Sequence, residues 1–591
     1  MIAKKTSKLF NYLAVRSWRV ILICLVNSIL LVEAAKTVDV TDFKTAGYEK
    51  DATPIVMAAI DFCRRNRVDK LIFPKAKYNF RKEFAVEKYL YISNNDEGLK
   101  RIVFDLSEIT DFEIDANGSE FIFNGFLCPF LLENSKNIVL KNFSIDYTRT
   151  FHSEGKIVAV GDKYIDLEIS KEYPYQLDNN ILIFKDNEGE KYPWANLLEF
   201  DAKKRETAQY AKDYYRYSNV SFTQLQSGRV RLQSDIKGTI GNVLTFGPSH
   251  RLVPAVTISD SKDIKISGIS IYHSGGMGII AQRSGNIFLQ DVKVTPAPSK
   301  DRIVSCTADA THFSGCYGQI ELKNCLFENQ KDDATNIHGV YVRLEKFLSD
   351  SKIIVRLIHP QQFGDGFIRP NDRVEFVDPK SLKTKSYSSV KSILKINKEQ
   401  MVVEFDAPLD KTLRSGDALA QINQFPSVLI KGCTIRNNRA RGILLGSRGK
   451  IVVDSNYFHT PGSAILFEGD ASHWYEQAGV RNVEIKNNVF DNCNFGVWGK
   501  ACIQVGSGIV AENRDSNNYN QNVVLKNNLF RIFDPRILNV YAIDGLVFDD
   551  NKIEKTVEYV SKYSTDQNFI IEGCLNVSIQ KINQVLDSAN R

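Results

Sequence analysis

The chain has 591 residues, of which 43% are hydrophobic and 25% are charged. This composition is typical of a globular protein with a large core and excludes disorder as the default state. The formal net charge of +6 is spread along the chain without a basic stripe, so nucleic acid is not a predicted partner.

Residues 1–35 have the pattern of a signal peptide. Basic residues precede an apolar run from Val20 to Val32, and the small residues Ala34 and Ala35 follow it. The run is too short to cross a bilayer comfortably. We therefore expect cleavage near Ala34 or Ala35, a secreted or periplasmic protein, and no integral membrane contact. Lipidation at Cys24 is not expected, because the residues before it are not small.

Nine cysteines remain after the signal peptide, and none has the CxxC or Cys/His spacing of a metal site. Cys325 and Cys433 stand at apolar positions of a repeat, where a buried thiol packs as a small hydrophobe. The sequence therefore predicts neither a metal nor a cofactor.

A helix is predicted near the mature N-terminus, within segment 36–146. Thr53 and Pro54 form a plausible N-cap and first turn, and apolar residues follow to Phe62. Such a helix would cap the end of a repeat structure whose first coil begins at Lys70.

A six-residue template recurs along the chain, in which apolar residues flank a polar or small turn that is most often Asn. Neighbouring copies lie 23 residues apart at 266 and 289, 430 and 453, and 525 and 548. One coil of a parallel β-helix takes about this length, and Asn suits a left-handed turn with stacked side-chain amides. The copies include Leu140-Lys-Asn-Phe-Ser-Ile, Ile266-Ser-Gly-Ile-Ser-Ile, Leu322-Lys-Asn-Cys-Leu-Phe, Ile430-Lys-Gly-Cys-Thr-Ile, Ile485-Lys-Asn-Asn-Val-Phe and Leu525-Lys-Asn-Asn-Leu-Phe.

Two stretches, 147–250 and 340–425, interrupt the repeat with alternating strand-like runs. We expect small antiparallel β-modules inserted in loops, which would either wall a cleft or only decorate the solenoid. Coils would then occupy 251–339, with the predicted site, and 426–591. The predicted fold is all-β, a right-handed parallel β-helix of the pectate-lyase-like kind with an N-terminal capping helix and two inserted antiparallel β-modules.

The segments Asp309-Ala-Thr-His-Phe-Ser-Gly and Asp333-Ala-Thr-Asn-Ile-His-Gly align on Asp-Ala-Thr at a separation of 24 residues, about one coil. Stacked strands lie about 4.8 Å apart. Asp309 and Asp333 are therefore predicted neighbours, and Asp332 adds a third carboxylate. We expect Asp332 and Asp333 at the turn before the strand, because strict alternation would bury Asp333 without a partner.

The same alignment predicts one row of inward side chains and one row of outward side chains. The inward row is Phe313, Ile337, Leu444 and Phe467, and the outward residues are His312, Asn336, His338 and Glu468.

Crowded carboxylates can keep one group protonated while another stays ionised, which is the division that glycoside hydrolysis requires. Asp309, Asp332 and Asp333 are the predicted catalytic residues. Predicted substrate-binding residues are the outward His312, Asn336, His338 and Glu468, together with Asp470 and Trp474. Arg439, Arg441 and Arg448 could bind hydroxyl groups or be solvated.

At these residues the chain resembles glycoside hydrolase family 110, the bacterial α-1,3-galactosidases that cleave blood-group-B structures. The motifs are Thr307-Ala-Asp-Ala-Thr-His-Phe-Ser-Gly, Lys331-Asp-Asp-Ala-Thr-Asn-Ile-His-Gly and Arg441-Gly-Ile-Leu-Leu-Gly-Ser-Arg-Gly-Lys. The resemblance implies an inverting exo-glycosidase without metal, a glycan substrate with terminal α-galactose, and essential acids at Asp309, Asp332 and Asp333. It does not assign the acid and the base.

Other functions on this fold stay open. A polygalacturonase would share the Asp-Asp motif but would also carry Gly-His-Gly and Arg-x-Lys, of which only His338-Gly339 is present. A polysaccharide lyase or a non-catalytic glycan-binding β-helix are further alternatives. Linear or branched substrate preference and a homodimer are also left open.

Overall fold

The computed structural model of the chain describes residues 36–585, apart from 216–219, 424, 516 and 564–566. The predicted signal peptide and its cleavage site lie outside the described residues. No helix in the described part has the length and apolar character needed to span a bilayer.

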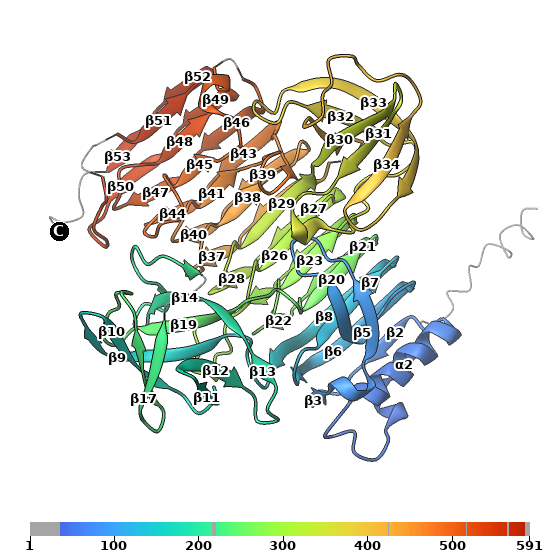
Figure 1. Ribbon diagram of the computed structural model, residues 1–591, viewed down its shortest axis with the longest axis vertical. Helices are drawn as coiled ribbons and strands as arrows, with labels where there is room; N and C mark the ends of the chain where they lie inside the picture. Colours follow the sequence, from blue (N-terminus) through green and yellow to red (C-terminus); the bar gives the residue numbers. More distant parts are fainter. Residues whose placement is uncertain (1–35, 216–219, 424, 516, 564–566, 586–591) are drawn as a thin grey trace, which may run out of the picture.

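The body of the molecule is a parallel β-helix, whose coils run diagonally from the blue end to the red end in Figure 1. Within the solenoid, strands of adjacent coils pair almost entirely in parallel, as in β24 with β27 and in β26 with β29. The 13-stranded sheet that carries the candidate site contains β4 (Val86–Leu90), β5 (Gly98–Asp105), β7 (Cys128–Glu133), β20 (Val256–Ser259), β23 (Ile279–Gln282), β26 (Thr311–Ser314), β29 (Thr335–Val340), β38 (Ile443–Leu445), β41 (Ile465–Phe467), β42 (Glu476–Gln477), β45 (Ile503–Val505), β48 (Leu538–Tyr541) and β51 (Phe569–Glu572).

The other solenoid strands form a 23-stranded sheet built from the predicted repeats. Its strands are β1 (Thr37–Asp39), β2 (Lys70–Ile72), β3 (Lys77–Phe80), β6 (Thr110–Phe123), β8 (Lys136–Tyr147), β21 (Lys262–Ser267), β22 (Ser270–Ile271), β24 (Gly285–Gln290), β25 (Lys293–Val294), β27 (Tyr317–Lys323), β28 (Leu326–Glu328), β36 (Ser427–Lys431), β37 (Thr434–Arg436), β39 (Lys450–Asp454), β40 (Tyr457–His459), β43 (Asn482–Lys486), β44 (Val489–Asp491), β46 (Asn520–Lys526), β47 (Leu529–Ile532), β49 (Ile543–Asp549), β50 (Lys552–Lys555), β52 (Leu575–Gln580) and β53 (Asn583–Val585).

Asparagine has both of its predicted roles at the turns of the repeat. Asn487 and Asn527 have φ values of 56° and 55°, in the left-handed region where Asn costs less than most residues. The next residues form a buried amide ladder in which Asn488 donates to Asn528 at 3.0 Å and Asn528 donates to Asn551 at 2.9 Å. These turns fix the coil length and hold the coils in register.

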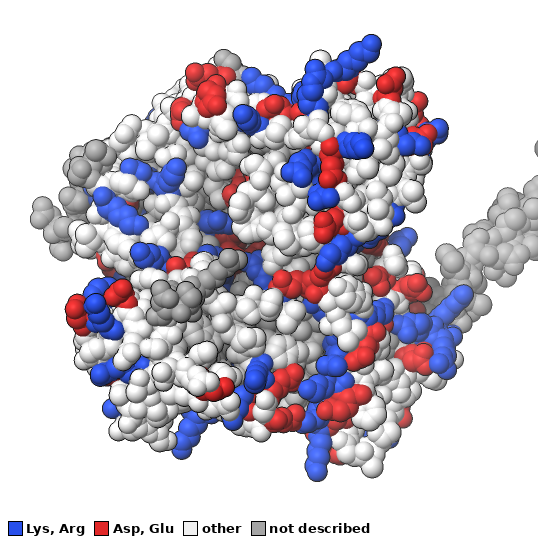
Figure 2. Space-filling model, in the orientation of Figure 1, with Lys and Arg blue, Asp and Glu red and all other residues white. Residues whose placement is uncertain are grey.

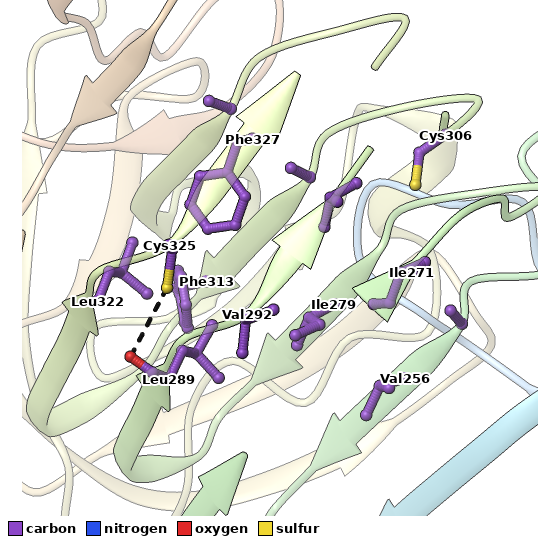
Figure 3. Packing of buried hydrophobic residues seen from close by; sticks show 14 of the residues in the cluster. Val256, Ile271, Ile279, Leu289, Val292, Cys306, Phe313, Leu322, Cys325 and Phe327 are labelled. Atoms are coloured by element: carbon purple, nitrogen blue, oxygen red, sulfur yellow. Dashed lines mark hydrogen bonds between the residues drawn. The ribbon is translucent and has the colours of Figure 1, made fainter. Parts of the chain in front are cut away.

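The inside of the solenoid is filled by apolar side chains from successive coils (Figure 3). Cys325 lies in this core with its thiol 3.7 Å from the carbonyl oxygen of Leu289. All nine described cysteines are free and eight are buried, so Cys325 and Cys433 pack as predicted.

Helix α2 (Thr53–Asn66) caps the N-terminal end beside β5, as predicted. The predicted N-cap was wrong by one residue, because Ala52 is the N-cap and Thr53 is already helical. Asp51 supplies the missing side-chain acceptor, since its Oδ1 accepts the Thr53 N–H at 2.9 Å.

Two antiparallel modules interrupt the coils. The first lies at the lower left of Figure 1 and has an 8-stranded and a 3-stranded sheet. We call it module I. Its strands are β9 (Ser153–Gly161), β10 (Tyr164–Ile169), β11 (Tyr175–Asp178), β12 (Ile181–Lys185), β13 (Lys191–Tyr192), β14 (Trp194–Asp201), β15 (Glu206–Thr207), β16 (Tyr214–Tyr215), β17 (Ser221–Gln226), β18 (Arg229–Gln233) and β19 (Val243–Pro248).

The second insertion, module II, is a closed barrel at the upper right of Figure 1. Arg448 from the solenoid holds it by pairing with the buried Glu375 at 2.5 Å and 3.0 Å. Its strands are β30 (Val342–Ser349), β31 (Lys352–Arg356), β32 (Arg373–Val377), β33 (Thr384–Lys395), β34 (Gln400–Phe405) and β35 (Ala418–Gln421).

The predicted inward row is wrong at one position. Ile337 pairs with Leu445, whereas Leu444 pairs with Asn336 and belongs to the outward row. Module II separates the two strands in sequence, so no fixed coil length could be counted across it. The run Ile443-Leu-Leu also gave no alternation from which to choose the register.

Candidate active site

Three aspartates meet at the start of two adjacent strands. Thr311 of β26 pairs with Thr335 of β29, so Asp309 and Asp333 occupy equivalent places just before their strands. One carboxylate oxygen from each of Asp309, Asp332 and Asp333 lies within 4.8 Å of the other two. The unbroken 24-residue spacing produces this convergence, as predicted.

Asp332 is held as a carboxylate by two guanidinium groups. Its Oδ2 lies 2.5 Å from Arg251 Nη2, and its Oδ1 lies 3.0 Å from Arg439 Nη1. Burial alone would raise the pKa of Asp332, but Arg439 and Arg251 lower it below the ordinary value of 3.8. Asp332 is therefore ionised near neutral pH.

Asp333 is held by one arginine on both oxygens. Arg441 donates from Nε to Oδ1 at 2.8 Å and from Nη2 to Oδ2 at 2.7 Å, and its backbone N–H adds a third bond at 3.0 Å. Burial raises the pKa of Asp333 to about 7, although Arg441 opposes the shift. These bonds fix the side chain and leave it little freedom to rotate.

Among the described residues, no arginine bonds Asp309. Its Oδ2 lies 2.7 Å from Nδ1 of His312, which is only 1% exposed. Burial and the neighbouring charge of Asp332 raise the pKa of Asp309 well above 3.8. Asp309 is therefore protonated near neutral pH.

The three oxygens are close enough to share a cation. However, Arg251, Arg439 and Arg441 place three positive charges directly on Asp332 and Asp333. Because these charges already offset the carboxylates, the arrangement does not require a metal ion.

A pocket of about 170 Å³ opens beside Asp332, lined by Arg251, Arg439 and the buried Lys331. A crevice lined with acidic and basic side chains crosses this face of the molecule (Figure 2). The pocket wall contains Asn196, Asp213 and Tyr215 of module I and Gln361 of module II. Both insertions thus contribute to the cleft that the solenoid alone would leave open.

Asp213 connects module I to the cluster. Its Oδ2 accepts hydrogen bonds from Arg439 at 2.7 Å and from the Trp498 indole at 3.1 Å. Arg439 therefore bridges Asp213 and Asp332, which fixes the distance between the pocket wall and the carboxylates.

The predicted binding residues of the outward row lie at the cluster, where His312, Asn336 and His338 form hydrogen bonds with protein partners. His312 bonds Asp309 and His338, and Asn336 donates to Glu476 at 3.4 Å. Glu468 is partly exposed, and burial raises its pKa to about 7 despite Arg441 nearby.

Asp470 and Trp474 belong to one loop. Asp470 accepts backbone N–H groups of residues 472–474, so its carboxylate shapes the loop. Trp474 is 38% exposed and packs against His359, with ring centroids 4.6 Å apart. The loop thus presents an apolar ring surface to solvent.

Sequence reasoning missed Arg251, Asp213, Lys331 and Glu476. Arg251 lies 81 residues from its partner Asp332 and follows module I, so no spacing rule connects the two. Arg439 and Arg441 were considered only as binders of hydroxyl groups or as solvated residues. Their position two residues apart on the coil after Asp332 was the available signal.

Family models match three parts of the chain: GLAA-B beta-barrel domain I over 153–244, GLAA-B beta-barrel domain II over 352–419, and a right-handed β-helix region over 418–586. The two barrel models fall within modules I and II, and the third agrees with the predicted hand of the solenoid.

Curated relatives cover almost the whole chain. Alpha-1,3-galactosidase A of Shewanella woodyi is 37% identical over 93% of this chain and 92% of its own. Alpha-1,3-galactosidase B of Bacteroides thetaiotaomicron is 31% identical over 94% and 93%.

Among solved structures, a family 28 exopolygalacturonase of Yersinia enterocolitica covers 92% of this chain and 78% of its own, at 10% identity and a TM-score of 0.32. That likeness is too loose to bear on function. The identity and coverage of the curated relatives, together with the two barrel models, confirm the predicted family: the chain belongs to the bacterial α-1,3-galactosidases of glycoside hydrolase family 110.

Proposed function

We propose that this glycoside hydrolase removes terminal α-1,3-linked galactose from oligosaccharides, with Asp309 as general acid and Asp332 as general base. The relatives are named for α-1,3-galactosidase activity. The observation that carries the assignment is the contrast between two carboxylates within 4.8 Å of each other, because two guanidinium groups bond Asp332 whereas Asp309 bonds His312. Hydrolysis of a glycosidic bond needs one proton donor and one proton acceptor at the anomeric centre.

The acid and base assignment follows from the contacts of each oxygen. Arg251 and Arg439 keep Asp332 ionised, so its carboxylate is available to accept a proton from water. Asp309 Oδ1 accepts no hydrogen bond from any described residue, so the carboxyl group can rotate and direct its proton at the leaving oxygen. Asp333, bonded three times to Arg441, is proposed to position its neighbours.

The pocket supports exo action on a single sugar. Its volume of about 170 Å³ is below the roughly 300–1,000 Å³ of typical ligand pockets. Exposed Trp474 is proposed to stack on a sugar ring that lies outside this pocket. Asn336, His338 and Glu468 line a second, smaller cavity. A blood-group-B structure, with terminal galactose, is the proposed natural substrate.

Inversion is proposed from the family resemblance and from the guanidinium contacts. The oxygen spacing is nearer the roughly 5–5.5 Å of retaining enzymes than the roughly 6.5–9.5 Å of inverting ones. However, guanidinium bonds to both oxygens of Asp332 and of Asp333 hold these carboxylates in place and lower their nucleophilicity, while a remaining lone pair can still accept a proton from water. A water held beside Asp332 is the proposed nucleophile.

The activity test compares an α-1,3-galactosyl disaccharide, a fucose-branched blood-group-B trisaccharide and polygalacturonate. We expect galactose from the first two and no product from the third. Proton NMR should detect β-galactose first if the reaction inverts. Early α-galactose would refute inversion alone, and release of uronate would refute the substrate class. We also propose a secreted or periplasmic location and a homodimer.

A further inference from the structure

A line of buried side chains leads away from the cluster on the side of Asp309. Nδ1 of His312 lies 2.7 Å from Asp309 Oδ2, and its Nε2 lies 2.8 Å from His338 Nε2. Nδ1 of His338 lies 2.7 Å from the Gly339 carbonyl oxygen, and its Nε2 lies 3.5 Å from Glu476 Oε1. We call this line the His312–His338 chain.

The partners assign the hydrogen atoms along the chain. A carbonyl oxygen only accepts, so His338 carries hydrogen on Nδ1 and, when neutral, has a lone pair on Nε2. His312 must then donate from Nε2, and its Nδ1 has the lone pair. Asp309 Oδ2 must therefore donate to His312, which requires a protonated Asp309.

Burial agrees with this neutral arrangement. It lowers the pKa of His312 well below 6.5, with the nearby His338 acting in the same direction. Burial also raises the pKa of Asp309. The other charged and titratable groups that face the chain are Asp332, Asp333, Glu476, Arg251, Arg441 and Cys306.

We propose that the His312–His338 chain transfers one proton between Asp309 and His338 during the catalytic cycle. Asp309 Oδ2 gives its proton to His312 Nδ1 while His312 Nε2 gives its own to His338 Nε2. The products are an Asp309 carboxylate, a neutral His312 and a His338 imidazolium. One proton moves in all, and no electron transfer or outside reactant is required.

Glu476 stabilises the imidazolium state. Its carboxylate lies beside His338 and accepts hydrogen bonds from Asn94 at 2.9 Å and Asn336 at 3.4 Å. His338 and Glu476 line a small cavity with the partly exposed Glu468, which gives the proton a way to solvent. Asp309 can thus exchange its proton while a sugar fills the pocket. His312 and His338 are positioning residues, since they act through Asp309.

This inference rests on the proposed function, and its test separates the two. In the full-length protein, Glu476→Gln keeps one of the two acceptor oxygens that Asn94 and Asn336 use and removes the charge. We expect kcat/KM to keep its acidic limb and its basic limb, which reports Asp309, to move down by roughly one pH unit. His338→Gln should move the same limb and lower kcat about tenfold or more with KM within about twofold.

His459→Gln is the matched control, because His459 also bonds a backbone carbonyl and a glutamate, at 2.6 Å and 2.9 Å, outside the cluster. Its pH profile should equal that of the wild type. If the pH profile of kcat/KM is unchanged in both Glu476→Gln and His338→Gln, even with a lower kcat, the proton transfer is overturned and the His312–His338 chain has only a structural role. Full activity of Asp309→Asn would instead refute the proposed function.

Discussion

Two stacks of buried polar side chains cross adjacent coils of the same solenoid. In the amide ladder, Asn488 bonds Asn528 and Asn528 bonds Asn551, so neutral groups satisfy one another within the repeat. At the cluster, Asp309 and Asp333 stack in the same manner but carry carboxylates that cannot satisfy one another. Arginines from outside that stack compensate Asp333 and its neighbour Asp332, whereas Asp309 bonds His312.

The same stacking of side chains on adjacent coils is structural in the amide ladder and, we propose, catalytic in the aspartate cluster. A ladder of amides stabilises the coils without a titratable group. A stack of acids depends on Arg251 at the end of module I and on Arg439 and Arg441 one coil further on. Buried charged side chains with so large a desolvation cost indicate a functional site.

Removing the proposed base should have the largest effect. Asp332→Asn is expected to lower kcat/KM by roughly 10²–10⁴-fold, because the amide cannot accept a proton from water. Galactose release and circular dichroism would be measured together. Asp291→Asn, at an exposed left-handed turn, is the control with unchanged activity. Near-normal activity of Asp332→Asn in a folded protein would exclude Asp332 as the base.

An aspartate placed in the amide ladder should have the desolvation cost of the aspartate cluster without arginines to offset its charge. Asn528→Asp is expected to lower the free energy of unfolding by about 3–5 kcal/mol at pH 7. The new acid would have a raised pKa in the folded state, so stability should recover as pH falls toward 4. Asn528→Ala, costing about 1–3 kcal/mol, should show no such recovery. Equal pH profiles for the two variants would contradict the comparison.

The cluster should also make wild-type stability depend on pH. The folded pKa of Asp333 is raised from 3.8 to about 7, so its contribution is complete below pH 4 and is lost as pH rises to 7. We expect a loss of roughly 2–4 kcal/mol over that window, reduced in Asp333→Asn. Chemical denaturation at pH 4.5 and 7.5 measures the change in the free energy of unfolding. An equal change in wild type and Asp333→Asn would disprove the raised pKa of Asp333.

The smallest effect is expected at Trp474. Trp474→Ala should raise KM by roughly 2- to 10-fold with little change in kcat, because stacking on a remote sugar contributes about 0.5–1.5 kcal/mol. Tyr387→Ala, which removes an exposed aromatic side chain on module II, is the control. An unchanged KM for a trisaccharide would remove Trp474 from the binding surface.

The sequence predicted what depends on repeat length and little that depends on the insertions. Asp309 and Asp333 could be placed together because no insertion separates their coils. Leu444 was misplaced because module II intervenes before its strand. Arg251 could not be assigned, since only the packing of module I brings it to Asp332. Crowding predicted that the aspartates would differ in protonation, but which of them is protonated depends on these contacts and was equally out of reach.

The most direct test of the central claim compares Asp309→Ala with Asp332→Ala on dinitrophenyl α-galactoside, with and without azide. If Asp309 is the acid, Asp309→Ala should retain much more activity on this substrate than on a disaccharide, because the leaving group needs no proton. Asp332→Ala should regain activity with azide and form β-galactosyl azide. Azide rescue of Asp309→Ala, with leaving-group dependence confined to Asp332→Ala, would contradict the account.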